Sequence, residues 1–373
     1  MLIPLKRFLK KYKMINNKKI LFFAPSIEEG GVEKNLFTVA NFIANLNVYK
    51  VYVLTANRNK KKFFNKKINF VSPSTNYWSN KSRLLKTLIC VKLFFTKINF
   101  NKILIFSFQS NLFAILIAKL LNLKVIIRSN TDPFGYISNI LKKYLFRLIL
   151  SKADIIIVNS NEFKNNLKKM LNINSKLIYN PIKINKLKNN YINKNKTLNI
   201  INIGRLTDQK NQILLLKAIN ILKKKIFIKC LIICKGNNLI SLKDYIKNNN
   251  LEKNVKLLGY KKKPWNYTRG FDVFVLTSKY EGLPNVLLEA INENKVVVST
   301  NCPSGPKEIL SNGKSGFLFP INNHVKLANI LNYINNNKNS ALNKNKLARK
   351  NLLKFNYKIN LEKYKNIINK YLN

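Results

Sequence analysis

Residues 281–289 read Glu-Gly-Leu-Pro-Asn-Val-Leu-Leu-Glu, and they follow an apolar, strand-like run at residues 271–278. A strand, a tight polar turn and an amphipathic run form the order in which an α/β fold opens a ligand crevice at the carboxyl end of a strand. Backbone N–H groups at the start of the following helix can face a polar ligand. Glu281 and Glu289 can hydrogen-bond sugar hydroxyls from the two ends of the turn. The pattern therefore favours an enzyme that binds a nucleotide sugar.

The N-terminal half of the chain alternates short β-branched runs with helical patterns. Its most apolar stretch, residues 103–123, is interrupted by polar residues between Gln109 and Lys119, so it predicts a strand followed by a buried helix and not a membrane span. A helix is expected over residues 32–46. Because short strands alternate with helices, we expect a parallel sheet covered on both faces. The expected strands lie at residues 19–24, 51–55, 102–107, 123–128 and 153–158.

A second set of alternating strands and helices is expected after a segment that lacks the apolar pattern. Residues 182–196 lose the apolar pattern and become rich in Lys and Asn, which is typical of a linker. We therefore expect an α/β protein of two Rossmann-like domains, at residues 1–182 and 197–352, joined by a linker at 183–196. Residues 353–373 are expected to form a C-terminal helix that can cross back to the first domain. The strands expected in the second domain lie at residues 198–203, 227–234, 255–258, 273–276 and 296–299, with a helix from about residue 212.

The formal net charge of +53 admits two interpretations. Read alone, it indicates a polyanion-binding protein. Of the 68 basic residues only eight are Arg, however, and the lysines are spread along the chain among many Asn and Ile residues. Because AT-rich codons encode Lys, Asn and Ile, a drifted genome composition explains the charge, and we expect no specific nucleic-acid partner. So basic a surface should still dwell near anionic lipid headgroups or acidic glycans.

Histidine and cysteine are scarce, which excludes several kinds of site. His324 is the single histidine and lies in an Asn-rich segment, where we expect a solvated loop residue. A His-based triad and a His-rich metal site are thereby excluded. The four cysteines show no ladder of spacings. Cys230 and Cys234 lie in an apolar run and are expected to be buried small hydrophobes, in a reduced, cytoplasmic setting.

The N-terminal residues 1–13 are basic and partly apolar. They lack the long apolar core and the small-residue cleavage site of a signal peptide. Two interpretations are equally supported: a short basic amphipathic segment that touches a membrane, and a frayed basic tail.

Gly204-Arg205-Leu206 stands at the end of the second domain's first expected strand, and Lys210-Asn211 precede the next helix. An Arg and a Lys five residues apart over a helix N-terminus can hold a diphosphate, the Arg through its fork and the Lys as a point charge. The alternative is two more basic residues in a basic chain. Because Arg is rare here and strand ends are where α/β folds bind ligands, we favour phosphate binding.

Two further loops could contribute to a ligand site. Gly30 and Gly31 follow the first strand and allow close backbone approach to a phosphate or sugar, although a plain turn would use them equally well. Residues 302–308, Cys-Pro-Ser-Gly-Pro-Lys-Glu, form a rigid loop that should lie on the same side as Glu281. Its Ser304 and Lys307 could contact the ligand, or Ser304 could cap the next helix.

Together these segments resemble the family 4 retaining glycosyltransferases, which have the GT-B fold. The resemblance runs from Gly30 to Glu308 in the right order, and the paired glutamates are its most specific part. The loop at residues 302–308 resembles the branch that transfers N-acetylgalactosamine or related hexoses onto lipid-linked oligosaccharides. The matching segments read Gly-Gly-Val-Glu, Gly-Arg-Leu, Lys-Asn, Glu-Gly-Leu-Pro-Asn-Val-Leu-Leu-Glu-Ala and Cys-Pro-Ser-Gly-Pro-Lys-Glu-Ile.

The resemblance implies a role for each charged residue. It implies that Arg205 and Lys210 bind the nucleotide diphosphate and stabilise it as the leaving group. It further implies that Glu289 holds the ribose hydroxyls and that Glu281 contacts the donor sugar.

The resemblance also implies roles for uncharged positions. Gly30 and Gly31 would bring the first domain's backbone close to the β-phosphate, Gly204 belongs to the phosphate motif, and Tyr260 would lie near the base. The backbone N–H groups implied to serve the sugar and the diphosphate are those of Asn285, Val286 and Leu287.

The chain departs from the family in one respect. Many members carry a His at the active-site edge of the first domain, whereas here the corresponding strand ends read Ser107-Phe-Gln109 and Arg128-Ser-Asn130. Front-face retention, in which the departing phosphate oxygen takes the acceptor proton, needs no protein base. Asp132 is the nearby carboxylate that could assist, although an Asp before a proline is also a common turn residue.

The resemblance implies a metal-independent transferase that moves a hexose or N-acetylhexosamine from a UDP-linked nucleotide sugar to a glycan or lipid-linked acceptor, with retention of configuration. We expect no cofactor beyond the donor and no metal, because GT-B enzymes stabilise the leaving group without one and the chain has no Asp-x-Asp pair. The expected location is the cytoplasm, with peripheral contact at an anionic inner membrane face. The alternatives are a nucleotide-sugar epimerase of the same fold and a non-catalytic polyanion-binding protein.

Overall fold

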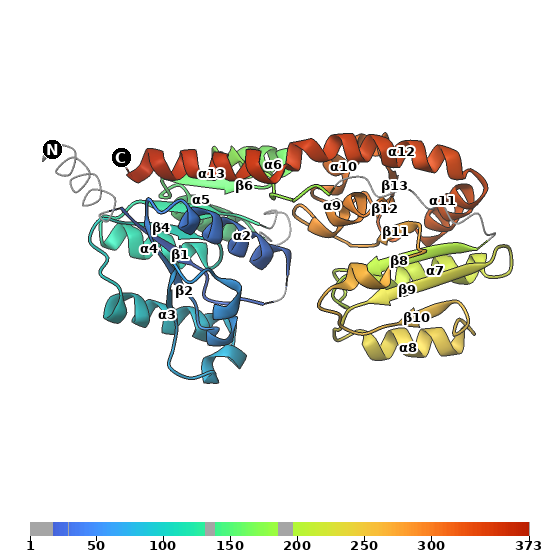
Figure 1. Ribbon diagram of the computed structural model, residues 1–373, viewed down its shortest axis with the longest axis horizontal. Coiled ribbons are helices and arrows are strands. Elements are labelled where there is room, and N and C mark those ends of the chain that lie inside the picture. The colour runs from blue at the N-terminus through green and yellow to red at the C-terminus, as the bar shows by residue number, and fades with distance from the viewer. Residues whose placement is uncertain (1–17, 29, 131–138, 186–196, 373) are drawn as a thin grey trace, which may run out of the picture. The chain divides into compact units, whose positions relative to one another are not determined.

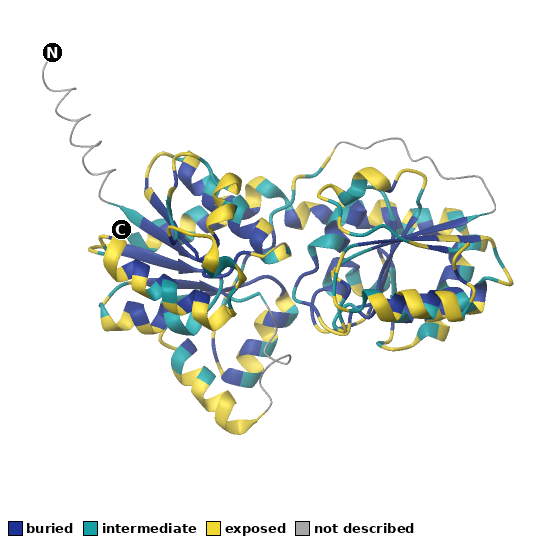
Figure 2. Ribbon diagram, turned by 90° about the horizontal axis from the view of Figure 1, so that it is seen from below, coloured by how far each residue is buried: buried dark blue, intermediate teal, exposed yellow. Residues whose placement is uncertain are grey.

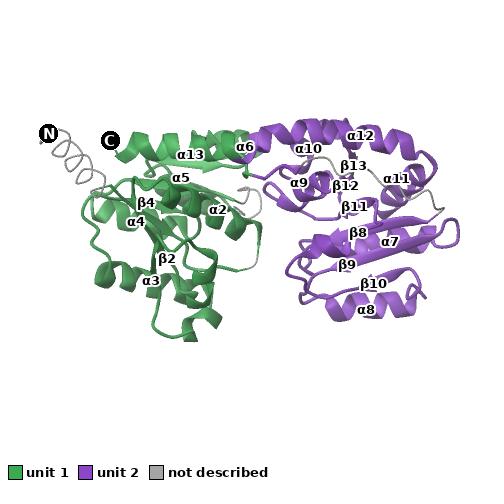
Figure 3. Ribbon diagram, viewed as in Figure 1, with its two compact units in different colours: residues 1–159, 163–181, 358–373 green, residues 160–162, 182–357 purple. Residues whose placement is uncertain are grey.

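A computed structural model describes residues 18–28, 30–130, 139–185 and 197–372 of the chain. The chain divides into two compact units, which Figure 3 colours separately. Unit 1 comprises residues 1–159, 163–181 and 358–373, and unit 2 comprises residues 160–162 and 182–357. The last helix of the chain therefore belongs to the same unit as the first strand.

Unit 1 is built on a seven-stranded sheet of order β3-β2-β1-β4-β5-β6-β7, in which every neighbouring pair is parallel. Figure 1 shows the helices that cover it. The strands are β1 (Lys19–Phe23), β2 (Lys50–Leu54), β3 (Asn69–Val71), β4 (Ile103–Ser107), β5 (Val125–Arg128), β6 (Ile155–Val158) and β7 (Lys176–Leu177). The helices are α2 (Gly31–Asn45), α3 (Arg83–Lys97), α4 (Asn111–Leu120), α5 (Ile140–Leu150), α6 (Asn161–Leu171) and α13 (Tyr357–Leu372), with short 3-10 helices η1 (Arg58–Phe63) and η2 (Tyr77–Asn80).

The central strands of unit 1 are buried on both faces, as their continuous apolarity predicts. On one face Leu21 and Phe23 belong to a core that includes residues of α3, α4, α5 and α6. On the other face the rings of Phe22 and Phe106 stack with centroids 5.4 Å apart, and Tyr364 of α13 lies 6.0 Å from Phe106. Figure 2 shows these strands as the buried centre of the unit. The C-terminal helix is thus part of this core.

Unit 2 is built on a six-stranded sheet of order β10-β9-β8-β11-β12-β13, and all its pairs are parallel. One face packs on α7, α8 and α11 in a single apolar core. The strands are β8 (Leu198–Ile203), β9 (Ile228–Ile233), β10 (Val255–Leu257), β11 (Val273–Leu276), β12 (Val296–Thr300) and β13 (Phe317–Phe319). The helices are α7 (Gln212–Leu222), α8 (Leu239–Asn248), α9 (Asn285–Asn292), α10 (Pro306–Ile309), α11 (His324–Asn336) and α12 (Lys338–Asn351), with 3-10 helices η4 (Pro264–Tyr267), η5 (Ser311–Gly313) and η6 (Leu352–Phe355).

In both sheets the strand order reverses beside the first strand. β1 lies between β2 and β4, and β8 lies between β9 and β11. Because all the strands are parallel, the carboxyl ends of β1 and β4 meet at one edge of the first sheet, and those of β8 and β11 meet at one edge of the second. Doubly wound folds bind ligands at such a switch point.

Two expectations about the polar and the small residues are wrong. His324 is not a loop residue but the first residue of α11, because Asn323 Oδ1 accepts from the Lys326 N–H at 2.8 Å and so caps that helix. Cys230 is buried as expected, but Cys234 lies past the end of β9 and is only partly buried. The Asn- and Lys-rich residues 335–350, to which sequence analysis gave no role, form the last two residues of α11 and most of α12.

Candidate active site

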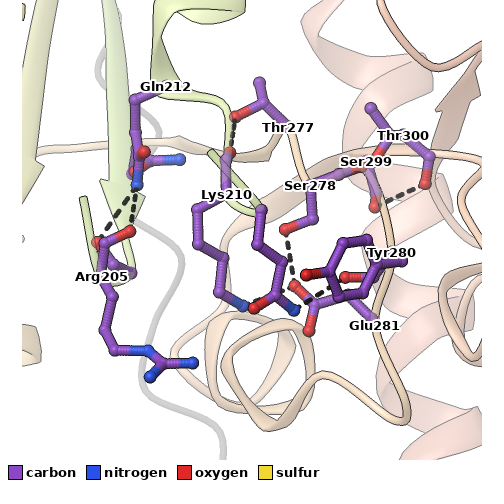
Figure 4. A network of polar contacts seen from close by, with 12 residues as sticks. Arg205, Lys210, Gln212, Thr277, Ser278, Tyr280, Glu281, Ser299 and Thr300 are labelled. Carbon is purple, nitrogen blue, oxygen red and sulfur yellow. Dashed lines mark hydrogen bonds and ion pairs between the residues drawn. The ribbon is translucent and has the colours of Figure 1, made fainter. Parts of the chain in front are cut away.

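Lys210 and Glu281 form an ion pair at the switch point of unit 2. Lys210 Nζ lies 2.5 Å from Glu281 Oε1, and the two side chains are 15% and 8% exposed. Ser278 Oγ donates to the same carboxylate oxygen at 2.6 Å. Figure 4 shows Lys210, Ser278 and Glu281 converging on one point. Because both charges are largely withdrawn from water and hydrogen-bonded, the pair is held in one geometry.

The two loops that carry this pair are fastened to each other. Thr277 Oγ1 donates to the Lys210 carbonyl at 2.7 Å. The Lys279 N–H donates to the Gln209 carbonyl at 2.8 Å, and Gln209 Nε2 donates to the Tyr280 carbonyl at 3.0 Å. The loop after β8 and the loop after β11 therefore form one continuous hydrogen-bonded rim.

Arg205 stands on the same rim with an exposed side chain. Gln212, which is 2% exposed, holds the turn in place: its Nε2 donates to the carbonyls of Gly204 and Arg205 at 3.2 and 3.0 Å. A methyl group on Gly204 would lie 3.7 to 3.8 Å from the carbons of the Lys210 side chain, so this stem passes across the glycine. Figure 4 shows Arg205 and Lys210 extending in the same direction from the turn.

The loop at residues 302–308 packs against the Glu281 turn, as expected. The Glu281 N–H donates to the Pro303 carbonyl at 2.7 Å, and the Ser304 N–H donates back to the Glu281 carbonyl at 3.1 Å. Of the two interpretations of Ser304, the helix cap is wrong, because Gly305 is the N-cap of α10 and Ser304 Oγ instead donates to the Gly282 carbonyl at 3.1 Å. Ser304 is fully buried, whereas Lys307 is exposed. Only Lys307 of this pair has a side chain open to solvent.

Gly305 is required by the close approach of these loops. Its φ is +93°, and a Cβ there would lie 2.2 Å from the Gly282 carbonyl oxygen. No side chain fits in that space without moving one of the two backbones. The position of Glu281 therefore depends on a glycine 24 residues further along the chain.

The start of α9 presents the backbone groups of the 281–289 motif. Asn285 is the first helical residue and Pro284 the N-cap, so the first-turn N–H groups include those of Asn285, Val286 and Leu287. The Leu287 N–H already donates to the Pro284 carbonyl at 3.0 Å. The helix N-terminus carries a partial positive charge that favours an anion or a polar ligand.

Glu289 lies one helical turn after Asn285, and side chains of a helix lean toward its N-terminus. Its carboxylate is therefore directed along the helix toward the turn that carries Glu281. Trp265 of η4 donates its indole N–H to Glu289 Oε2 at 2.9 Å, and the indole packs 5.9 Å from the ring of Phe274. The glutamate is thus oriented by an aromatic residue that the sequence motif did not reveal.

Tyr260 lies beyond β10, at the carboxyl ends of the strands, after Gly259 with a φ of +71°. It is 45% exposed, and Lys235, which follows β9, places Nζ 5.3 Å from its ring. The ring is therefore accessible on the same edge of the sheet as the other candidates in unit 2.

The glycines of unit 1 stand at the start of α2, at the other switch point. Gly30 is the N-cap and Gly31 the first helical residue. A Cβ on Gly30 would lie 2.7 Å from Glu33 Oε2, and Glu33 is 7% exposed. Gln109 Nε2 donates to Glu33 Oε1 at 3.0 Å, while Gln109 Oε1 accepts from the Ser26 N–H at 3.1 Å. The loops after β1 and β4 are thus joined through one glutamine. Asp132 lies outside the described residues.

Arg128 at the end of β5 is a buried residue to which sequence analysis gave no role. It is 1% exposed, and its guanidinium lies 5.6 Å from the centre of the Phe108 ring. Its Nε donates to Tyr364 Oη at 2.7 Å, and its terminal nitrogens donate to the amide oxygens of Asn130 and Asn180. Within the described part of the chain every acceptor around this cation is neutral. Arg128 fastens α13 to the sheet.

The described residues contain no group of three or more His, Cys, Asp or Glu that could hold a metal. Burial, and then the negative charge of Glu281, raise the pKa of the Cys302 thiol to about 12, so this cysteine next to the rim stays protonated. A cavity of about 800 Å³ in unit 2 is lined by Leu198, Val273 and Val296, the first residues of β8, β11 and β12. It therefore lies at the amino ends of the strands, away from the rim. None of the described helices is long and apolar enough to cross a membrane.

The two halves of the chain match models of two protein families. Residues 183–351 match the family described as "Glycosyl transferases group 1", and residues 29–186 match "Glycosyltransferase Family 4". The two matches follow each other along the chain and together cover most of it. Each half of the chain thus matches a glycosyltransferase family model, in the order that the GT-B fold has.

Several curated glycosyltransferases are similar to the chain over part of their length. The chain is 36% identical over 181 residues to an uncharacterized glycosyltransferase of Methanocaldococcus jannaschii, covering 45% of this chain and 44% of that one. It is 31% identical over 210 residues to the N-acetylgalactosamine-N,N'-diacetylbacillosaminyl-diphospho-undecaprenol 4-alpha-N-acetylgalactosaminyltransferase of Campylobacter jejuni, covering 53% and 56%. The chain thus spans about half the length of these two relatives. An uncharacterized glycosyltransferase of Haemophilus influenzae is 26% identical over 86% of this chain and 91% of its own.

Solved structures confirm the fold. HepE of Anabaena in complex with UDP matches with a TM-score of 0.76 and 18% identity, covering 94% of this chain and 100% of that chain. A variant of TarM of Staphylococcus aureus, in complex with UDP, Fondaparinux and alpha-GlcNAc-glycerol, matches with a TM-score of 0.76 and 16% identity, with the same coverage. At such identities the likeness concerns the fold, which is the expected α/β GT-B arrangement of two Rossmann-like domains.

Proposed function

We propose that this protein transfers a hexose or an N-acetylhexosamine from a UDP sugar to a glycan or lipid-linked glycan acceptor, with retention of configuration. The observation that carries the proposal is the buried Lys210–Glu281 pair at the switch point of unit 2, with Arg205 on the same rim. It gives a defined position to one cation and one hydrogen-bonding carboxylate at the edge where this fold binds ligands.

The cations of the rim suit the leaving group. Cleavage of a sugar–diphosphate bond leaves negative charge on the departing phosphate, and fixed cations stabilise that charge without having to reorganise. Lys210 is fixed by Glu281 and by the passage of its stem across Gly204. Arg205 is exposed and can close on the diphosphate with its planar fork. Lys210 supplies the preorganised charge, and Arg205 supplies directional hydrogen bonds.

The two glutamates suit the sugars at the two ends of the donor. A carboxylate has about four acceptor sites, so Glu289 can keep the Trp265 indole and still accept from vicinal ribose hydroxyls. Glu281 accepts from Lys210 and Ser278 through one oxygen, Oε1, and can direct the other toward a hydroxyl of the transferred sugar. The start of α9 supplies backbone N–H groups between them. In these roles the residues would hold the donor with its diphosphate next to Lys210 and Arg205.

Retention follows in this proposal from front-face attack, with the departing phosphate oxygen taking the acceptor's proton. This route asks for a stabilised leaving group rather than for a protein base, and the rim of unit 2 provides such stabilisation. The proposed reaction uses no metal, since Lys210, Arg205 and the helix terminus take over the charge compensation.

The acceptor class rests on the relatives. An Escherichia coli galactosyltransferase is 31% identical to the chain over 136 residues. Its name and that of the similar C. jejuni transferase both include the lipid diphosphate undecaprenyl group. A lipid-diphosphate-linked glycan is therefore the acceptor we propose, and the basic surface of the chain suits its charge.

Calorimetric titration with UDP, GDP and ADP at moderate salt tests the donor assignment. We expect UDP to bind most tightly, and Glu289→Ala to weaken that binding by roughly 10- to 150-fold, the equivalent of about 1.5–3 kcal/mol for hydrogen bonds to a charged group. Glu252→Ala, which removes an exposed carboxylate, is the matched control and should bind like wild type. Equal, salt-sensitive binding of all three nucleotides would mean that only the net charge is acting and would withdraw the proposal.

Turnover separates a transferase from an epimerase. The proposal predicts that donor is consumed only when a glycan acceptor is present, whereas an epimerase would interconvert or hydrolyse the free donor. Arg205→Ala should lower kcat more than it weakens UDP binding, because the charge that Arg205 faces grows in the transition state. If kcat and the affinity for UDP fell by the same factor, Arg205 would contribute to binding alone.

A further inference from the structure

Helix α5 of unit 1 exposes large apolar side chains along much of its length. Figure 2 colours most of this helix as exposed. The residues concerned are Ile140 (86% exposed), Leu141 (65%), Tyr144 (63%), Leu145 (48%) and Leu148 (47%). Scattered exposed leucines are ordinary on a protein surface, but five on one short helix form a patch that marks an interaction site.

These residues share one side of α5. At about 100° per residue, the five side chains span an arc of roughly 140°. The opposite side is the one that packs on the core of unit 1, through Leu150 and the half-buried Phe146 and Ile149. The helix is therefore apolar both toward the core and, on a separate face, toward solvent, and only the first of these faces has a partner in the described structure.

Basic residues border the exposed apolar face. Lys143 and Arg147 lie on one margin and Lys142 on the other, at the angles that the same helical periodicity gives. All three are exposed. Between residues 139 and 153 the chain has four basic residues and no acidic one. An apolar stripe flanked by cations is the pattern of a helix that lies in the interface of an anionic membrane.

Neighbouring helices of the same layer extend the surface. The core that includes Leu150 of α5 also contains buried residues of α3 and α4, so the three helices cover the same face of the sheet. On their outer sides α4 exposes Leu116 and Leu120, and α3 exposes Leu84, Leu88 and Phe95. The apolar face of α5 therefore belongs to a helical layer whose solvent side is unusually rich in large apolar residues.

We propose that the outer face of α5 docks on a lipid bilayer that contains anionic lipids. A helix of 11 residues is roughly 16 Å long, too short to span a bilayer, so it would lie in the interface plane with its apolar arc among the acyl chains. Lys142, Lys143 and Arg147 would meet the lipid phosphates. A second copy of the chain is a poorer occupant, because a two-fold contact through this face would bring like charges together.

Sedimentation with lipid vesicles tests the proposal on the full-length wild-type protein. Phosphatidylcholine vesicles are compared with vesicles containing about one-third phosphatidylglycerol, at roughly physiological salt. We expect the double variant Leu141→Gln/Leu145→Gln to lower the partition coefficient on anionic vesicles at least about tenfold, because it places amides where the face meets the acyl chains. Lys143→Gln/Arg147→Gln should lower it as well, and more strongly at low salt than at high salt.

The matched control is Phe227→Gln/Ile240→Gln in unit 2, which removes two apolar side chains that are each 72% exposed. This control should bind vesicles like wild type. All the positions lie on the surface, so circular dichroism and thermal unfolding should match wild type in every variant. Should the α5 variants bind like wild type and the control, the net charge or another segment carries lipid binding, and the proposal is overturned.

A spectroscopic probe gives a second, independent measurement. Tyr144→Trp places an indole at the centre of the apolar arc, and its emission should shift to shorter wavelength with anionic vesicles and be quenched by brominated acyl chains. No shift would overturn the proposal. So would light scattering that showed a dimer dissociated by Leu141→Gln/Leu145→Gln in the absence of lipid, since the face would then be an interface between copies. None of these measurements uses a sugar donor, so failure here is distinct from failure of the transferase assignment.

Discussion

The strand-end loops of the two sheets are built alike but hold the buried Arg128 and the largely buried Lys210 differently. In each, a glutamine amide fixes the loops at the strand ends: Gln109 joins the loop after β1 to Glu33 of α2, and Gln212 holds the turn that carries Arg205. Unit 2 then places a compact ion pair at its rim. At the end of β5, the strand next to β4, unit 1 instead surrounds the buried Arg128 with neutral amides and a tyrosine. The comparison indicates that Lys210 is placed to meet a charged ligand, whereas Arg128 holds the elements of unit 1 together.

The largest effect on turnover should come from removing the charge of Lys210 in unit 2. Lys210→Met keeps the stem but deletes the charge, and we expect kcat with a UDP sugar donor to fall by about 10²–10³-fold, as when a preorganised electrostatic contact is lost. Lys279→Met, an exposed lysine on the neighbouring loop, is the control and should retain activity. Wild-type turnover in Lys210→Met would show that the charge of Lys210 is not used in the reaction, and unit 2 would then not differ from unit 1 in this respect.

Removing the charge of Arg128 in unit 1 should lower the stability of the protein instead. Arg128→Met removes the hydrogen bonds that the guanidinium donates to Tyr364, Asn130 and Asn180, and we expect the free energy of unfolding in urea to fall by at least about 3 kcal/mol. Tyr364→Phe removes a single partner and should lose about half as much or less. A normal unfolding midpoint with lost turnover would instead assign Arg128 to the chemistry. The exposed Arg83 serves as the matched control through Arg83→Met.

Two glycines of unit 2 should differ when each is changed to alanine. Gly305→Ala puts a Cβ 2.2 Å from the Gly282 carbonyl oxygen at a φ of +93°, so we expect a loss of about 1–3 kcal/mol in stability and weaker UDP binding, because Glu281 must move with that loop. Gly204→Ala makes only ordinary contacts with the Lys210 stem, at 3.7 Å and beyond. It should stay within about 1 kcal/mol of wild type. Thermal unfolding with and without UDP measures both effects, and equal shifts would contradict the close approach described here.

The two glutamines should have smaller effects than Arg128. Gln109→Leu unpairs the Ser26 N–H and one oxygen of Glu33, while Gln212→Leu unpairs two backbone carbonyls. Each should lower stability by about 1–2 kcal/mol. Of the two, we expect Gln212→Leu alone to raise the Kd for UDP, since it loosens the turn that carries Arg205. Equal effects of the two variants on the Kd for UDP would contradict this expectation and would show that Gln109 also contributes to UDP binding.

The sequence revealed the elements whose signals are local. Continuous apolar runs predicted the central strands, and the strand, turn and helix around residues 281–289 were found where expected, with α9 starting at Asn285. Helix α12 was missed because Asn and Lys make up most of its sequence, and α11 was missed because its start at His324 lies in an Asn-rich segment. The amphipathic spacing of Leu327, Leu331 and Ile334, which are buried in α11, was the signal available there.

The candidate site was predictable to the extent that its residues sit in recognisable loops. Lys210 and Glu281 come together as their strand-end positions imply. Trp265, Ser278 and Gln212 carry no motif, and their roles depend on how the loops fold, since their side chains contact residues 24, 3 and 8 positions away. Arg128 was visible as a rare Arg, but only the packing of α13 shows why it is buried. The roles of the other candidate residues stay predictions.

The return of α13 to unit 1 has a consequence for the order in which the protein can be made. Leu361, Tyr364 and Ile368 are fully buried, and the helix that carries them comes at the very end of the described chain. As the polypeptide emerges from the ribosome, unit 1 lacks α13 until the residues that follow unit 2 have been synthesised, and by then unit 2 has all of its described strands. We therefore expect unit 1 to complete its core after the strands of unit 2 have been made, because Phe106 and Arg128 lack Tyr364 until then.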